Sequence, residues 1–353
     1  MHHQLKDIVL LVLFATLANA DDWVEFEIFG KSNETLLKRY GEFTNGIPSH
    51  DTIQRVIGSI KPKVFEGLQQ MWNEMLETNE GEKIKKLLSI DGKTMRGNGN
   101  QSQGALHVVT AWAKENGISF GQKEVIGKGK EIPAILDLLD TISVKNHVVT
   151  IDAIGTQGKI AQKIHKGGGD YVLAVKDNQK TLHEDIQLYF ADKENSDKIK
   201  EHECYKKTKE KAHGQIEMRE YYQTDAIKWL DPEGKWHGIR SIGMAKNTYT
   251  KQDKKTTETR YYISSLPPDI DLFAESVRGH WAVESMHWHL DVTFREDANK
   301  TLERTSALNL NIIRKWALSI LKTLDLGKKY SLKKKRFALN CNFPQYIDAL
   351  MAL

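Results

Sequence analysis

Two aspartates in this sequence each follow a short apolar run. The run Leu87–Ile90 leads into Asp91, and His147–Ile151 stops at Asp152. A carboxylate beside a buried strand is usually hydrogen-bonded, ion-paired or metal-bound, because burying an unpaired charge is costly. On neighbouring strands the two acids can hold divalent cations, and such ions promote phosphoryl transfer. Turns also use aspartate freely, so the pattern alone leaves a turn role open for both.

A third candidate acid lies in a stretch with helical spacing. On a helix over 272–291, His280, Glu284, His287 and Asp291 stand at i, i+4, i+7 and i+11 and form one polar stripe. An ordinary solvated helix face has the same pattern. A di-iron site is not supported, since no second Glu-x-x-His occurs on another predicted bundle helix. A zinc site lacks both a cysteine partner and an HExxH frame.

The elements that must position these residues follow from apolar periodicity. Three successive strands, two of them joined by an Asn116-Gly117 turn, and then alternating helices and strands predict an α/β fold with a mixed sheet flanked by helices. Residues 192–213 are rich in Lys and Glu, which predicts an exposed or mobile segment. The predicted strands are 87–90, 106–113, 118–125, 147–151, 171–175, 217–223, 238–245 and 260–264, and the predicted helices are 131–139, 157–165, 272–291 and 308–321.

The N-terminal apolar run Ile8–Ala20 allows two interpretations. It has the length of a secretory signal peptide, with Ala18-Asn19-Ala20 as a cleavage site. Lys6 and Asp7 before it offset each other, which favours a buried helix instead. The run is too short to span a bilayer, and no other segment approaches that length. Residues 1–83 are predicted to be a mostly helical unit.

Composition and charge narrow the class of protein. Of 353 residues, 40% are hydrophobic and 28% charged, which excludes a collagen-like, disulfide-scaffold or disordered chain. The two cysteines are far apart, which favours a reducing compartment. The net charge is +4, but residues 300–336 carry eleven bases against two acids. This stretch predicts contact with a polyanion, with a solvated helix end as the alternative. Its candidate DNA contacts are Lys333, Lys334, Lys335 and Arg336.

Four groups of short motifs stand out along the chain. They are NGIPSHDT at 45–52, IDGKTMRG at 90–97, TIDA at 150–153 with GGDY at 168–171, and RGHWAVE at 278–284 with HWHLDV at 287–292. With these motifs the sequence resembles, over nearly its whole length, the H-repeat-associated branch of insertion-sequence transposases. These are bacterial DDE recombinases with a ribonuclease-H-like core.

The resemblance implies that Asp91, Asp152 and Glu284 are the catalytic, metal-binding triad. Two Mg²⁺ ions are implied as cofactors, and Mn²⁺ can substitute. The partner is double-stranded DNA, at the element ends and at the target, and a homodimer is expected on DNA ends. A cytoplasmic location and no membrane contact are expected. The residues that flank the triad and are candidates for DNA contact are Lys93, Arg96, Arg278 and His280, with helix-surface packing as the alternative for the last two.

The same resemblance divides the chain into domains. It implies a helical N-terminal domain over 1–83 and a ribonuclease-H-like core over 84–176 and 272–325. A β-rich insertion over 177–271 and a basic C-terminal tail over 326–353 complete the chain. The sequence departs from the wider group at Val277, His280 and Asp291, where Tyr, Arg and Lys are usual. A non-catalytic DNA-binding remnant and a secreted protein therefore stay as rival hypotheses.

Overall fold

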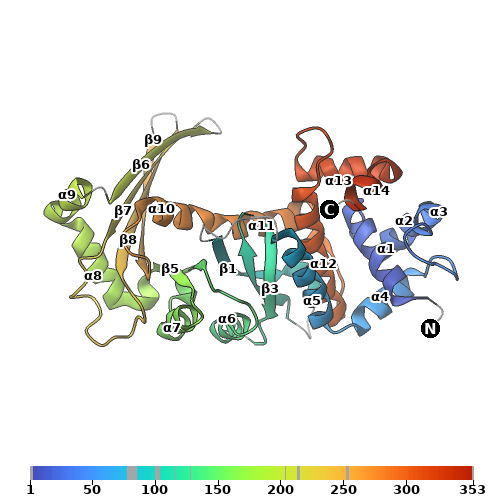
Figure 1. Cartoon of the computed structure of the whole chain (residues 1–353), viewed down its shortest axis with the longest axis horizontal. Coiled ribbons are helices and arrows are strands. Elements are labelled where there is room, and N and C mark those ends of the chain that lie inside the picture. The colour runs from blue at the N-terminus through green and yellow to red at the C-terminus, as the bar shows by residue number, and fades with distance from the viewer. Residues whose placement is uncertain are drawn as a thin grey trace.

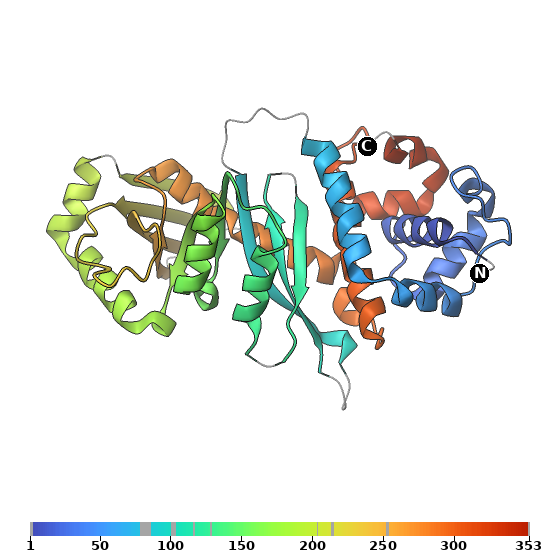
Figure 2. The same ribbon diagram turned by 60° about the horizontal axis from the view of Figure 1, so that its bottom comes forward.

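The computed structural model describes residues 3–77, 86–99, 104–115, 117–127, 129–202, 204–212, 215–251 and 254–351. A sheet with helices on both faces occupies the middle and one end of the elongated molecule (Figure 1). A lobe built of helices forms the other end, and both chain termini lie there (Figure 2).

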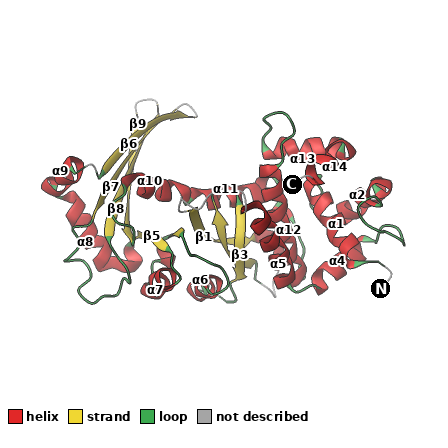
Figure 3. Cartoon of the chain, viewed as in Figure 1, coloured by secondary structure: helices red, strands yellow, loops and turns green. Residues whose placement is uncertain are grey.

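One mixed sheet runs through the middle and the far end of the molecule (Figure 3). Its nine strands have the order β3-β2-β1-β4-β5-β9-β8-β7-β6. β1 pairs antiparallel with β2 and parallel with β4, while β5 joins β4 in parallel and β9 antiparallel. The predicted β-rich insertion therefore extends the core sheet. The strands are β1 (Lys86–Met95), β2 (Leu106–Ala113), β3 (Ile118–Glu124), β4 (His147–Ile151), β5 (Asp170–Val175), β6 (Tyr205–Ala212), β7 (Gln215–Thr224), β8 (Ser241–Lys251) and β9 (Lys254–Ser264).

Helices cover both faces of the sheet. α6 (Glu131–Leu139) and α7 (Gly158–Lys166) pack on one face, where Ile90 and Ile151 are buried. α10 (Ile270–Gly279) packs on the other, with Phe273 against Leu87 and Val148. α11 (Trp281–Val292) continues along that second face, as Figure 1 shows. The mixed α/β architecture with helices on its faces is confirmed.

Several predicted elements differ from the observed ones. β1 runs past Asp91 to Met95, because its pairing with β2 continues after the pairing with β4 ends at Ile90. The predicted helix over 272–291 is divided into α10 and α11 at His280. The segment 192–213 is not featureless, since it holds α9 (Lys193–Glu201) and the edge strand β6, whose lysines discourage pairing with other chains. Asn116 of the predicted turn lies outside the described residues.

The helical lobe has a single core shared by both ends of the chain. The apolar run predicted as a buried helix forms α1, with Ile8 and Leu11 fully buried beside Leu318 of α12 and Leu339 of α13. The lobe comprises α1 (Leu5–Leu17), α2 (Trp23–Ser32), α3 (Glu34–Leu37), α4 (His50–Ser59), α5 (Pro62–Glu77), α12 (Arg304–Thr323), α13 (Leu332–Cys341) and α14 (Phe343–Met351).

The N-terminal helices contact the C-terminal ones. α4 and α5 both pack against α12, and the predicted division of the chain into domains stays a prediction. The boundary at 83–84 lies outside the described residues. The tail over 326–353 is helical and packs on α1 and α12. Within the described part of the chain, α8 (Lys180–Ala191) is the remaining long helix, and none of the helices is long and apolar enough to cross a membrane.

A glycine fixes how closely the end of β1 approaches the segment after α11. A Cβ at Gly97 would lie 2.3 Å from the carbonyl oxygen of Asn299 and 2.7 Å from that of Asp297. Because both obstacles are backbone atoms, Gly97→Ala should lower the free energy of unfolding by about 1–3 kcal/mol. Urea denaturation measures this loss. Gly67→Ala in α5 is the control, since nothing lies within 4 Å of its added Cβ. Equal stability of the two variants would contradict this packing.

Candidate active site

The three predicted acids line one cavity. Its volume is about 340 Å³, and it lies where β1 and β4 meet the α10–α11 side of the sheet. Asp91 of β1, Asp152 after β4 and Glu284 of α11 all line it. Other residues around it include Thr150, Arg260 and His280.

The strand register brings the two aspartates together. Ile90 and Ile151 are the last partners in the parallel β1–β4 pairing, and Asp91 and Asp152 follow them directly. The Asp152 carboxylate accepts a hydrogen bond from the backbone N–H of Ile154 at 3.2 Å. Burial raises the pKa of Asp152, and the negative charges of Asp91 and Glu131 raise it further. The two aspartates therefore repel each other, and a cation between them would relieve this repulsion.

A histidine of α11 stabilises the charge on Asp91. His287 Nδ1 lies 3.4 Å from Asp91 Oδ2. Burial opposes ionisation of Asp91, but its hydrogen bond with His287 and the charges of His287 and His280 outweigh this, so its pKa lies below the ordinary value. The first aspartate of the pair is thus the more readily ionised one.

His280 joins the α10–α11 junction to the sheet. Its Nδ1 lies 3.1 Å from Thr150 Oγ1, and Thr150 donates in turn to Ser89 Oγ at 3.0 Å. Burial lowers the pKa of His280, while Asp91 and Asp152 act in the opposite direction. The structure therefore places His280 in the cavity wall, where it links the helix to β4.

Glu284 is exposed and faces an arginine from the insertion. Arg260 of β9 interacts electrostatically with Glu284, and its Nε donates to Glu258 at 2.8 Å. Its guanidinium also lies 5.9 Å from the centroid of the Trp281 ring. The cavity lining thus combines the three acids with a cationic group from β9.

The acids around the cavity offer the oxygen donors that a divalent ion prefers. Asp91 and Asp152 form an adjacent carboxylate pair, and Glu284 borders the same cavity. Within the part of the chain that the structure describes, no three acidic, histidine or cysteine side chains converge closely enough to hold a metal. The adjacent pair offers oxygen donors of the kind that a divalent cation prefers, and Glu284 lines the same cavity.

The other predicted DNA contacts divide into engaged and exposed groups. Lys93 is only 10% exposed and pairs with Asp291 at 2.7 Å, and its phosphate contact stays a prediction. Arg96 has 85% of its side chain exposed. Arg278 is about half exposed and pairs with Glu210 at 3.0 Å.

The basic run 333–336 is divided in the same way. Arg336 is fully buried and donates to the carbonyls of Thr16 and Ala20 and to Asp21. Lys335 donates to the carbonyls of Leu321 and Leu324 at the end of α12. The donors of these two residues bind backbone acceptors inside the protein, and their contact with DNA stays a prediction. Lys333 and Lys334 are exposed.

Two further residues, Glu131 and Arg260, lie near the acids and were not among the predicted site residues. Glu131 at the start of α6 lies beside β1, since a Cβ on Gly92 would meet its carboxylate at 2.6 Å. Its only signal in the sequence is its place as the first residue of a predicted helix. Arg260 belongs to a predicted strand, but nothing in the sequence indicates that this strand reaches the cavity.

Comparison with known proteins gives the same assignment along the whole chain. Residues 1–73 match the family described as DDE_Tnp_1-associated, and residues 82–320 match the Transposase DDE domain. "Putative transposase YncI" of Escherichia coli O157:H7 is 38% identical, over 99% of this chain and 90% of that protein. "H repeat-associated putative transposase YhhI" of Escherichia coli K12 is 36% identical, over 95% and 89% respectively. "Inactive transposase YbfQ" of the same strain is 48% identical over 59 residues, which are 17% of this chain and 70% of that protein.

These matches agree with the geometry of the site. The matched DDE domain contains Asp91, Asp152 and Glu284, the three acids that line the cavity. The relatives match the N-terminal helices as well as the sheet. The chain therefore belongs to the family of transposases with a DDE domain.

Proposed function

We propose that this protein cleaves DNA at the ends of an insertion sequence and transfers the freed strand to target DNA. Asp91, Asp152 and Glu284 are the proposed catalytic acids. The observation that carries the proposal is their placement around one cavity, two of them side by side on β1 and β4 and the third on α11. The proposed partners are double-stranded DNA and a second copy of the chain at the paired ends, in the cytoplasm.

The acids serve as oxygen donors, not as proton donors. Two Mg²⁺ ions, or Mn²⁺, held by these carboxylates would supply the charge that activates an attacking oxygen and stabilises a leaving oxygen. His287 favours the ionised form of Asp91, which keeps its oxygens available. Arg260 stands on the insertion side of the cavity and is suited to hold a non-bridging oxygen of the phosphate. Glu284 is the third proposed ligand, and α11 presents it to the same cavity.

A nicking assay tests the proposal against the rival function of a DNA-binding remnant. The protein is incubated with a duplex that carries the element end and its flank, with and without Mg²⁺. The proposal predicts Mg²⁺-dependent cuts at the element boundary that leave a 3′-OH. Selective binding of this duplex without any cut would favour the remnant, a rival that the relative named as inactive keeps open.

Lys333 and Lys334 should contribute sequence-independent affinity for DNA. Each phosphate contact steepens the dependence of binding on salt by about 0.9 log units per log unit of salt. Replacing both lysines with alanine should therefore flatten this slope by up to about 1.8 units. Fluorescence anisotropy at several salt concentrations measures it. Lys198→Ala on the distant helix α9 is the control, and an unchanged slope in the double variant would show that these lysines do not touch DNA.

A further inference from the structure

Alternate residues of β1 point toward one side of the sheet and meet the α10–α11 helices there. Ser89, Asp91 and Lys93 share this face, because side chains in a strand alternate with a period of two. Ser89 Oγ donates to the carbonyl of Gly279 at 3.3 Å. Asp91 pairs with His287 and Lys93 with Asp291. The three contacts follow the same order along the strand and along the helices.

The spacing of the last two contacts suits both elements. His287 and Asp291 are four residues apart on a helix, a rise of about 6 Å. Asp91 and Lys93 are two residues apart on a strand, about 6.6 Å. Both pairs can therefore form together when α11 lies along β1. Glu284 is one turn before His287 on the same side of the helix, so these pairs also set its distance from the aspartates.

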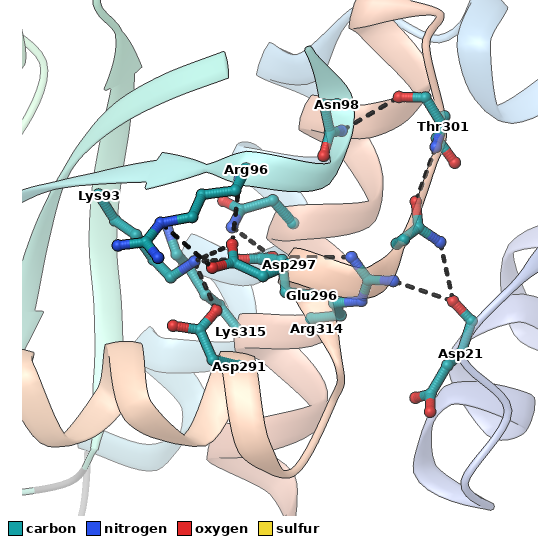
Figure 4. Close-up of polar contacts among 12 residues, drawn as sticks. Asp21, Lys93, Arg96, Asn98, Asp291, Glu296, Asp297, Thr301, Arg314 and Lys315 are labelled. Carbon is teal, nitrogen blue, oxygen red and sulfur yellow. Dashed lines mark hydrogen bonds and ion pairs between the residues drawn. The ribbon is translucent and has the colours of Figure 1, made fainter. Parts of the chain in front are cut away.

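We call the contacts Ser89–Gly279, Asp91–His287 and Lys93–Asp291 the ladder. Among them, Lys93 has the largest number of ionic partners. Lys93 Nζ lies 2.7 Å from Asp291, 3.2 Å from Glu296 and 3.2 Å from Asp297 (Figure 4). Glu296 is fully buried, and Asn311 of α12 donates to it at 2.8 Å. Arg314, also on α12 and buried, lies 3.7 Å from Glu296. One lysine on β1 thus connects the end of α11 to the central helix of the lobe.

The same network reaches the N-terminal helices. Arg314 donates to the backbone carbonyl of Asp21 at 2.9 Å, as Figure 4 shows. Asn299 donates to the same oxygen at 3.0 Å. These contacts are buried or partly buried, so solvent screens them weakly. A shift of α11 along β1 would break the contacts of Lys93 and strain this connected set.

We propose that Lys93 and Asp291 are positioning residues that fix α11 on β1 and thereby place Glu284 for catalysis. This inference rests on the proposed function of the acids. It replaces a DNA contact at Lys93 with a role inside the protein. Lys93 acts through Asp291 and Glu296, and it touches neither DNA nor the reacting atoms.

Asp291→Asn is the first test, because it removes one charge and leaves the buried Lys93–Glu296 pair intact. The rate of single-turnover cleavage of the end duplex should fall about 10- to 100-fold. A displacement of a catalytic group such as Glu284 by about 1 Å can lower a rate by up to about 100-fold. Affinity for the same duplex should change less than about 2-fold, because backbone contacts dominate it. Amide hydrogen exchange in α11 should accelerate at least about 10-fold while α6 and α7 keep their protection.

Lys93→Met and the double variant Lys93→Met/Asp291→Asn complete a double-mutant cycle with Asp291→Asn. If the two residues act as a pair, the double variant should cleave no more slowly than Lys93→Met alone. Lys93→Arg should restore part of the rate. Lys114→Met is the matched control, since Lys114 pairs with Glu275 of α10 at 2.8 Å but is not part of the ladder.

Two results would overturn the inference. Unchanged cleavage and unchanged exchange in Asp291→Asn would show that the pair does not hold α11. A parallel loss of DNA affinity and cleavage in Lys93→Met, with Asp291→Asn behaving as wild type, would return Lys93 to the DNA surface. If the wild-type protein does not cleave, the proposed function fails, and hydrogen exchange of α11 still decides whether the ladder fixes the helix.

Discussion

Asp152→Asn should abolish DNA cleavage while folding and DNA binding persist. The substitution keeps the size of the side chain and removes the charge beside Asp91. Mutation of a residue that only supports a metal ligand typically lowers activity about 10- to 100-fold. Loss of a direct ligand should therefore lower the cleavage rate at least about 100-fold. Single-turnover cleavage of the end duplex with Mg²⁺ measures the rate, and anisotropy measures the binding.

Asp140→Asn provides the control for this experiment. Asp140 is exposed and pairs with Lys163, away from the cavity lining. Its rate should stay within about 2-fold of wild type, because an exposed ion pair is worth little. Loss of folding together with cleavage in Asp152→Asn would instead indicate that the charge of Asp152 serves the fold.

Arg336→Met should cause the largest loss of stability. The guanidinium is fully buried, donates to the carbonyls of Thr16 and Ala20, and pairs with Asp21 at 2.9 Å. It also lies 4.3 Å from the centroid of the Phe294 ring. Its removal leaves these acceptors buried without a partner, which should cost about 3–5 kcal/mol. Urea denaturation measures the change.

Lys333→Met is the matched control for that loss. Lys333 is exposed on the same helix, so its substitution should alter the free energy of unfolding by less than about 0.5 kcal/mol. If Arg336→Met unfolds at the same urea concentration as Lys333→Met but binds DNA more weakly, Arg336 belongs to the DNA-contacting surface after all.

Local patterns predicted most of the core sheet. The strands over 106–113 and 147–151 and the helix over 131–139 match the observed bounds. These segments are apolar and end in turn residues, so local preference and burial agree. β1 was predicted too short, because the residues after Ile90 are polar and their strand conformation depends on pairing with β2. That pairing is a tertiary effect, and short-range periodicity does not report it.

Charge along the sequence predicted the exposure of basic residues poorly. Lys333 and Arg336 belong to one basic run, yet the first is exposed and the second fully buried. A helix turns by about 100° per residue, so neighbours in such a run face different surroundings. Lys93 illustrates the same limit. Its acidic partners Asp291, Glu296 and Asp297 come from about two hundred residues later in the chain.

Single-turnover cleavage by Glu284→Gln tests the central claim most directly, because Glu284 is the acid that the strands do not position. The account predicts a loss of at least about 100-fold in cleavage, with unchanged binding of the end duplex. Cleavage at the wild-type rate by Glu284→Gln, alongside its loss in Asp152→Asn, would contradict the claim. The third acid would then lie elsewhere. Glu131, whose charge already acts on Asp152, would be the next residue to substitute.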